Sequence, residues 1–118
     1  MIRAEFAVQV YILNGASQKA VAIEDFYLRA DSSEKFRVVV RNAGLQPLDT
    51  KAHIEITDKT TGREWKISEI TAAILPGDKR ISTFTLPAGL PKGSYLALAV
   101  VDGGDDLPVK VGELTFEH

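Results

Sequence analysis

KFRVVVRNAG, residues 35–44, is the segment from which the architecture of this chain follows most directly. Phe36, Val38 and Val40 occupy alternate positions, and the intervening positions hold Arg37, Val39 and Arg41. Because successive side chains of a strand point to opposite faces of a sheet, this alternation predicts a strand that buries one face. The Asn-Ala-Gly at its end is typical of a turn. We therefore expect Phe36, Val38 and Val40 in the core.

The same period of two continues on both sides of this segment. Turn residues separate the apolar runs, most of them at intervals of about 8–12 residues. Further strands are expected at residues 4–13, 20–28, 51–57, 64–68, 80–86, 94–102 and 109–116. Only residues 69–75 could form a single helical turn. This pattern predicts an all-β fold, an antiparallel β-sandwich or barrel, rather than a βαβ fold.

One of the expected strands changes phase halfway along. Val21 and Ile23 share one phase, whereas Phe26 and Leu28 share the other, and Glu24-Asp25 lies between them. A β-bulge inserts one extra residue and so restores a common inward face. The sequence therefore predicts a bulge, or a change of sheet, at this point.

The composition describes one soluble globular domain and narrows its chemistry. The chain has 118 residues, of which 45% are hydrophobic and 25% are charged. It has no cysteine, which excludes disulfide scaffolds, zinc ribbons, iron–sulfur sites and thiol catalysis. The net charge of −2 provides no positive field for nucleic acid. No apolar run reaches a membrane span, and no signal-peptide pattern is present.

Catalytic residues are hard to assemble from this sequence. The two histidines are His53 and His118, and His53 alternates with Lys51 and Glu55, so we expect it to face solvent on a strand. No Ser/His/Asp set and no phosphate-binding glycine pattern can be identified. We therefore expect a protein that is not an enzyme, with no cofactor, no metal and no small-molecule ligand.

An acidic turn, DGGDD at residues 102–106, could in principle bind Ca²⁺. Its carboxylates do not follow the EF-hand spacing, and four or more further oxygen ligands have no evident source. We expect a solvated turn and no Ca²⁺ site at Asp102, Asp105 and Asp106.

A basic stripe marks the outward phase of residues 35–41. Lys35, Arg37 and Arg41 share that phase, and Arg29 lies just before it. Such a stripe can dock an anion or a partner, which makes Arg37 and Arg41 candidate interaction residues. The favoured expectation is that the stripe pairs with carboxylates such as Glu55 on a neighbouring strand. Nucleic acid is not expected, because no exposed aromatic set accompanies the stripe.

Trp65 is the only tryptophan. It lies in phase with Ile67 after a predicted hairpin, and a single Trp among alternating apolar residues is expected in the core. The alternative is that its ring stacks on a sugar.

The second half of the chain resembles a known family of folds. Residues 86–95, LPAGLPKGSY, lead into the apolar run LALAVV. This resembles the penultimate strand of immunoglobulin-like and fibronectin type III-like sandwiches, in which a Tyr near the strand start hydrogen-bonds backward across a corner. The segment at 38–44 and the ILPG at 74–77 complete the resemblance. It implies an immunoglobulin-like antiparallel β-sandwich of seven to eight strands, with the Tyr95 hydroxyl bonded to backbone within 87–92.

More narrowly, the chain resembles the C-terminal Ig-like domain of bacterial envelope proteins related to periplasmic pilus-assembly chaperones. Residues 1–17, MIRAEFAVQVYILNGAS, resemble the junction that precedes this module. The basic residues with which those chaperones anchor a subunit have no counterpart here. The resemblance implies a non-catalytic structural or protein-interaction module of a larger periplasmic or cell-surface protein. Its partners would be other domains of the same polypeptide or another protein. A looser likeness implies the alternative, a carbohydrate-binding or enzyme-accessory module.

This resemblance also implies a domain division. Residues 1–17 would be an N-terminal strand and linker, and residues 18–118 would be the sandwich. The N-terminal strand is either the first strand of this sandwich or the closing strand of a preceding domain, and the resemblance favours the second origin. Phe6, Val8 and Val10 form an apolar face that must be buried, and they are candidate interaction residues. We expect residues 4–12 to dock on an edge of the sandwich or to drive weak self-association. We expect no direct membrane insertion.

Overall fold

The computed structural model describes the chain except for residues 1–5, 9–18, 30–34 and 105–106. In the described part the regular elements are all strands, and no helix there could cross a membrane. The eight strands are β1 (Phe6–Val8), β2 (Val21–Arg29), β3 (Lys35–Asn42), β4 (Leu48–Asp58), β5 (Glu64–Ile74), β6 (Lys79–Thr85), β7 (Ser94–Asp102) and β8 (Lys110–Glu117). The prediction of an all-β antiparallel fold is confirmed.

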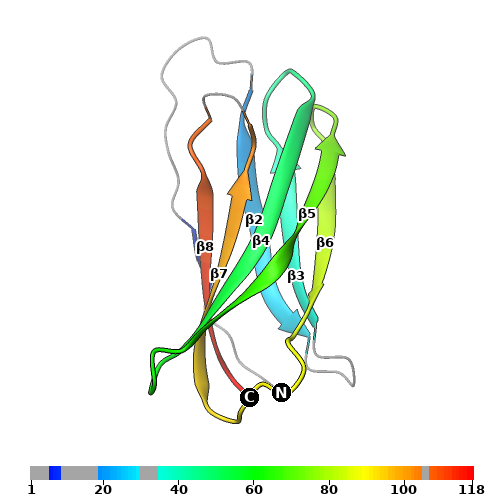
Figure 1. Ribbon diagram of the computed structural model, residues 1–118. Coiled ribbons are helices and arrows are strands. Elements are labelled where there is room, and N and C mark those ends of the chain that lie inside the picture. Colours follow the sequence, from blue (N-terminus) through cyan, green and yellow to red (C-terminus); the bar gives the residue numbers. More distant parts are fainter. Residues whose placement is uncertain (1–5, 9–18, 30–34, 105–106) are drawn as a thin grey trace.

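The strands form two sheets that pack face to face (Figure 1). The larger sheet has the order β1-β8-β7-β4-β5, and the smaller one has the order β2-β3-β6. In immunoglobulin lettering, β2, β3 and β6 take the places of strands A, B and E, and β4, β7 and β8 take those of C, F and G. β5 pairs with β4, where the variable-type strand C′ lies. The fold is therefore an immunoglobulin-like β-sandwich.

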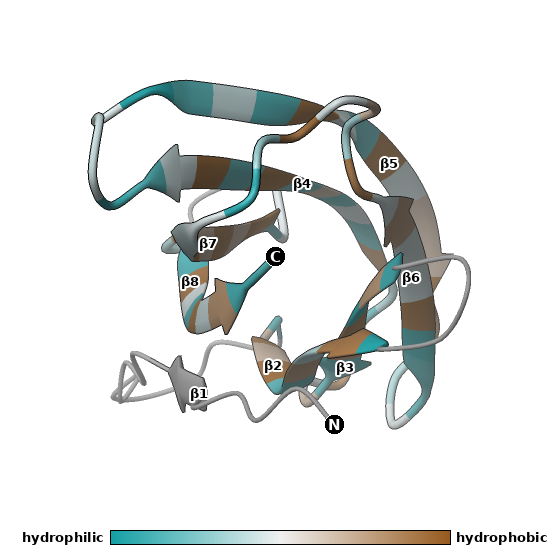
Figure 2. Cartoon of the chain, turned by 90° about the horizontal axis from the view of Figure 1, so that it is seen from below, coloured by the Kyte–Doolittle hydropathy of each residue, from teal (hydrophilic) through white to brown (hydrophobic). Residues whose placement is uncertain are grey.

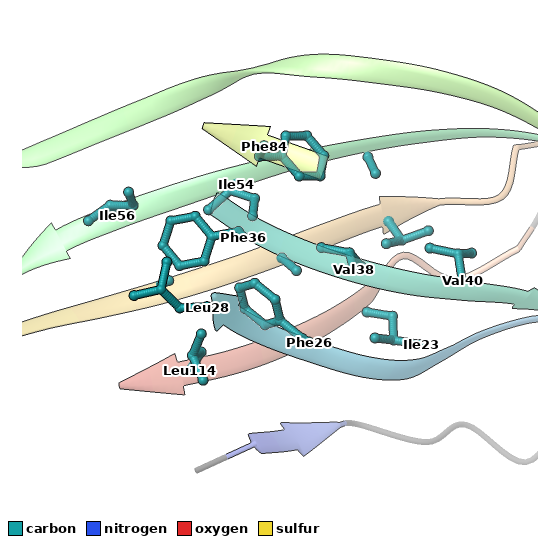
Figure 3. Close-up of a cluster of buried hydrophobic side chains, with 14 of the residues drawn as sticks. Ile23, Phe26, Leu28, Phe36, Val38, Val40, Ile54, Ile56, Phe84 and Leu114 are labelled. Carbon is teal, nitrogen blue, oxygen red and sulfur yellow. The ribbon is translucent and has the colours of Figure 1, made fainter. Parts of the chain in front are cut away.

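Side-chain alternation builds the core between the sheets. Figure 2 shows hydrophobic and hydrophilic residues alternating along the strands, and Figure 3 shows apolar side chains from both sheets meeting in the interior. Phe36, Val38 and Val40 of β3 are all buried, as predicted. The Phe36 ring contacts Phe116 of β8 edge-on, with ring centroids 5.3 Å apart, and so joins the smaller sheet to the larger one.

The predicted irregularity at Glu24 is a β-bulge. The register between β2 and β3 shifts between Ile23 and Asp25, which leaves Glu24 without a partner position on β3. The extra residue lets Val21 and Phe26, which have opposite sequence phases, both point into the core. The bulge also places the Glu24 carboxylate on the exposed face of the smaller sheet.

A second bulge, in β5, was not predicted. Ala52 pairs with Ile70 and Ile54 pairs with Ile67, so two residues of β5 stand opposite His53 of β4. Because this bulge switches the phase, Ile67 and Ile70 both pack against the core although they are three residues apart. The expectation of a helical turn at 69–75 is wrong, since these residues continue β5 up to Ile74.

Asn42, at the end of β3, is a buried polar residue that joins two loops. Its Nδ2 donates to the carbonyl oxygens of Gln46 at 2.8 Å and Ile74 at 2.9 Å, and its Oδ1 accepts from the Gly44 amide at 3.0 Å. Its backbone carbonyl also accepts from the Gly77 amide. One side chain therefore fixes the loop between β3 and β4 to the turn between β5 and β6.

The N-terminal segment is described only at β1. Phe6 pairs with Leu114 and Val8 with Gly112, along the open edge of β8. This part of the chain docks on an edge of the sandwich, which is one of the two expected outcomes. Val10 lies outside the described residues, and the division at residue 17 stays a prediction.

Candidate interaction surfaces

The end of the sandwich that carries the β3–β4, β5–β6 and β7–β8 loops displays exposed apolar side chains. Leu45, between β3 and β4, is 79% exposed, and Leu75, between β5 and β6, is 61% exposed. Both loops lie at the upper end of the molecule in Figure 1, and Asn42 bonds to the residues next to both leucines. Val109, between β7 and β8 at the same end, is also exposed. Sequence reasoning missed these three exposed residues because loops carry no periodicity that shows which side chains face outward.

The opposite end holds an open pocket of about 330 Å³ around Trp65. The Trp65 ring packs edge-on against Tyr95, with centroids 5.9 Å apart, and the Arg63 guanidinium lies 4.8 Å from its centroid. Trp65 is partly buried against the core. It is therefore neither fully buried, as a core residue would be, nor fully exposed, as a sugar-stacking ring would be. Thr61 and Lys92 also line the pocket.

Tyr95 forms the corner that the resemblance implies. Its side chain is fully buried, and its hydroxyl donates to the Pro91 carbonyl, within the predicted 87–92 range. Its ring stacks on Phe116, with centroids 5.4 Å apart. Burial, together with the nearby Asp58 carboxylate, raises the pKa of the Tyr95 hydroxyl above its usual value. These contacts give Tyr95 a structural role.

Asp58 caps the turn of the β4–β5 hairpin. Its Oδ1 accepts from the backbone amides of Thr60 at 2.8 Å and Thr61 at 3.2 Å. The Thr60 amide is the main reason that the pKa of the Asp58 carboxyl lies below its usual value.

We expect Asp58→Asn to change how the free energy of unfolding depends on pH. A lowered folded-state pKa gives stability that is present above the unfolded pKa and is lost as pH falls through the folded value. The stability difference between wild type and Asp58→Asn should therefore shrink as pH falls below about 4. Urea melts at pH 6 and pH 3 measure it, and an equal difference at both values would contradict the role of the charge.

The other predicted polar residues form smaller contacts. His53 lies in the outward phase of β4 with Lys51 and Glu55, as expected, although its side chain is only 17% exposed, and its Nε2 lies 3.2 Å from Glu55 Oε2. The backbone of His118 pairs with that of Gly93.

In the acidic turn, Asp102 accepts from the Gly104 amide at 2.8 Å, as a turn residue does. Asp105 and Asp106 lie outside the described residues, so the expectation about Ca²⁺ stays a prediction. The described residues hold no cluster of three or more metal-ligating side chains.

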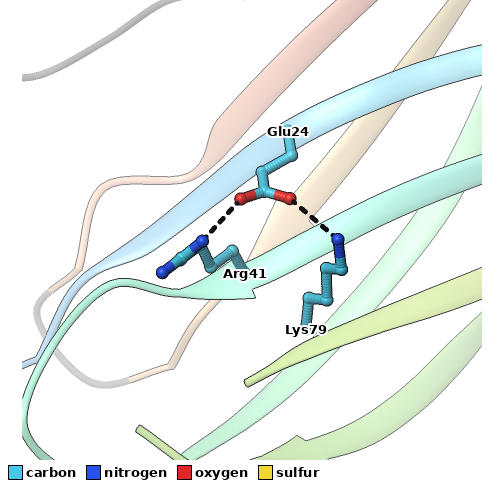
Figure 4. Close-up of polar contacts among 3 residues, drawn as sticks. All are labelled: Glu24, Arg41 and Lys79. Atoms are coloured by element: carbon cyan, nitrogen blue, oxygen red, sulfur yellow. Dashed lines mark hydrogen bonds and ion pairs between the residues drawn. The ribbon is translucent and has the colours of Figure 1, made fainter. Parts of the chain in front are cut away.

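The basic stripe lies on the outer face of the smaller sheet. Arg41 Nη1 lies 3.0 Å from one oxygen of Glu24, and Lys79 Nζ lies 3.9 Å from the other (Figure 4). The expectation that Glu55 pairs with the stripe is wrong, because Glu55 belongs to β4 in the opposite sheet, whereas the neighbours of β3 are β2 and β6.

No protein-family model matches this chain, and no curated protein sequence matches it either.

Proposed function

We propose that this chain is a non-catalytic immunoglobulin-like module with a structural or protein-interaction role in a larger bacterial extracytoplasmic protein. Its partner would be another domain of the same polypeptide or another protein. The observation that supports this function best is the pair of exposed leucines, Leu45 and Leu75, on two loops that Asn42 joins.

Three properties make this pair suited to binding. Large exposed apolar groups that gather in one place are typical of interaction sites. Loops held by a rigid β-scaffold are common binding elements. The Asn42 hydrogen bonds hold both loops before any partner arrives, which lowers the entropy that binding would lose.

The periplasmic or cell-surface location is supported by the resemblance to chaperone-related envelope domains. The full-length gene product tests it. A signal peptide and a second β-domain upstream would favour an envelope module. A neighbouring hydrolase domain would favour an accessory module instead.

We expect a photo-crosslinking amino acid at position 75 to capture a discrete partner in cells that make the full-length protein. The added Leu45→Ser substitution should weaken that crosslink, while the free energy of unfolding changes by no more than about 0.5 kcal/mol, since Leu45 is exposed. The same probe at Thr61, in the turn between β4 and β5 at the opposite end of the molecule, is the matched control. Equal crosslinking from both positions, or none from position 75, would contradict the proposal.

Carbohydrate binding is the second candidate, and the open pocket beside Trp65 favours it. Arg63 covers part of the indole ring, so a sugar would have to approach beside the guanidinium. An oligosaccharide that shifts Trp65 fluorescence, with the shift lost in Lys92→Ala, would replace the protein-interaction proposal with this one.

A further inference from the structure

β7 is hydrophobic along most of its length (Figure 2), so it presents apolar side chains to both faces of the larger sheet. The core positions at its centre hold Ala97 and Ala99, which are 0% and 1% exposed. The outer positions hold the larger residues Leu96, Leu98 and Val100, which are partly buried. A strand whose second face meets water normally carries polar residues there. Packing of the core therefore does not account for these outer aliphatic residues.

The strands on either side of β7 continue this apolar surface. The register sets Val111 of β8 beside Val100. It also sets Thr57 of β4 and Thr115 of β8 on either side of Leu96. The ladders that join β7 to β4 and to β8 have no register shift, so alternate residues stay on one face. We define the outer patch as Leu96, Leu98, Val100 and Val111.

Two exposed carboxylates flank the outer patch in one row. Glu55 of β4 and Glu113 of β8 both stand in register with Leu98, one on each side. Glu55 contacts His53 at 3.2 Å, and Lys66 of β5 stands in register with Glu55 on its other side. Glu113 forms no ion pair or side-chain hydrogen bond within the part of the chain that the structure describes. The β8 side of the outer patch therefore carries a carboxylate that is free to bind a cation.

The rest of this outer face is acidic as well. Among the described residues of β4, β5, β7 and β8, the outward lysines are Lys51 and Lys66. The outward carboxylates of the same strands are Asp49, Glu55, Glu64, Glu69, Asp102, Glu113 and Glu117. An apolar centre with a charged rim is the usual anatomy of a protein–protein interface. A second copy bound through the same face would bring carboxylates against each other, and like charges across an interface repel. The charge of this face therefore favours a basic partner.

We propose that the outer face of β4, β7 and β8 docks a basic, apolar segment of a protein partner. Apolar side chains of that segment cover the outer patch, and its cations bind Glu113 and Glu55. The proposal rests on the proposed protein-interaction function but uses a different surface from the Leu45–Leu75 end.

The test is a titration of the full chain with a synthetic peptide that alternates lysine and leucine, followed by amide chemical shifts in about 50 mM salt. We expect saturable shifts at Leu98 and Glu113. Glu55→Gln/Glu113→Gln should weaken binding at least about tenfold, because charge-assisted hydrogen bonds are lost. The matched control, Glu24→Gln/Asp25→Asn, removes the same charge from the opposite sheet and should change affinity less than about twofold.

Further arms separate the alternatives. Leu98→Lys places a cation between the two carboxylates, so it should weaken peptide binding at least about tenfold even if the double variant fails to fold. A peptide that alternates glutamate and leucine has the opposite charge and should not bind. Equal binding of both peptides, or equal loss in the matched control, would overturn the proposal. Sedimentation of the chain alone as a dimer that Leu98→Lys dissociates would also overturn it, because a second copy would then cover this face. The crosslink from position 75 should persist in Leu98→Lys, which separates failure of this face from failure of the proposed function.

Discussion

Tyr95→Ala should lower the free energy of unfolding by about 3–5 kcal/mol, as truncation of a large buried aromatic side chain does. The ring is fully buried and packs against Trp65 and Phe116, so its removal leaves a cavity between the start of β7 and its neighbours. Tyr95→Phe keeps the ring and removes only the hydrogen bond to the Pro91 carbonyl, so it should cost about 1 kcal/mol. Urea melts of both variants measure these differences. Two variants as stable as the parent would show that Tyr95 does not stabilise the fold through its ring and its hydrogen bond.

Alkaline pH gives an independent check of the same hydroxyl. The folded-state pKa of Tyr95 is raised, so its contribution is fully present below the unfolded pKa and is lost as pH rises through the folded value. The parent should therefore lose stability relative to Tyr95→Phe above about pH 10. Parallel curves for the two proteins from pH 8 to pH 11 would contradict the burial of this hydroxyl.

Asn42→Ala should cost about 3–5 kcal/mol, because buried groups left without partners each cost roughly 1–3 kcal/mol. The change strands the carbonyls of Gln46 and Ile74 and the amide of Gly44. Asn42→Asp keeps the shape but sets a carboxylate oxygen against the two carbonyls, so it should destabilise the fold at least as much at pH 7.

The measurement for Asn42 is a set of urea melts together with hydrogen exchange. The Gly44 and Gly77 amides, which bond to Asn42, should lose protection first in both variants. An Asn42→Asp protein with parental stability and parental protection at Gly77 would show that the amide does not join the loops.

Residue patterns within single strands predicted those features of the fold that depend on one strand alone. The alternation at Phe36 identified β3, and the phase switch at Glu24 identified the bulge in β2. β5 was harder, because its own bulge puts Ile67, Ile70 and Ile74 at intervals of three and four residues, which is also a helical spacing.

The candidate surfaces depend more on contacts between distant residues. Sheet membership decided that Arg41 pairs with Glu24 and not with Glu55, and no local pattern reports which strands share a sheet. The sequence predicts only an ordinary turn residue at Asn42. Its role depends on Ile74, which lies 32 positions away and approaches only in the folded chain.

The order of strands in the two sheets also governs how the chain finds its fold. The pairs β2–β3, β4–β5 and β7–β8 are neighbours in sequence, and such hairpins form in about 1–10 μs. β4 must also find β7, and β3 must find β6, across long intervening segments. Closing those segments lowers chain entropy before the new contacts compensate, so folds of this kind take milliseconds to seconds. We therefore expect the long-range pairings β4–β7 and β3–β6 to limit the refolding rate, and strand edges that are still unpaired stay open to other chains until the two sheets close.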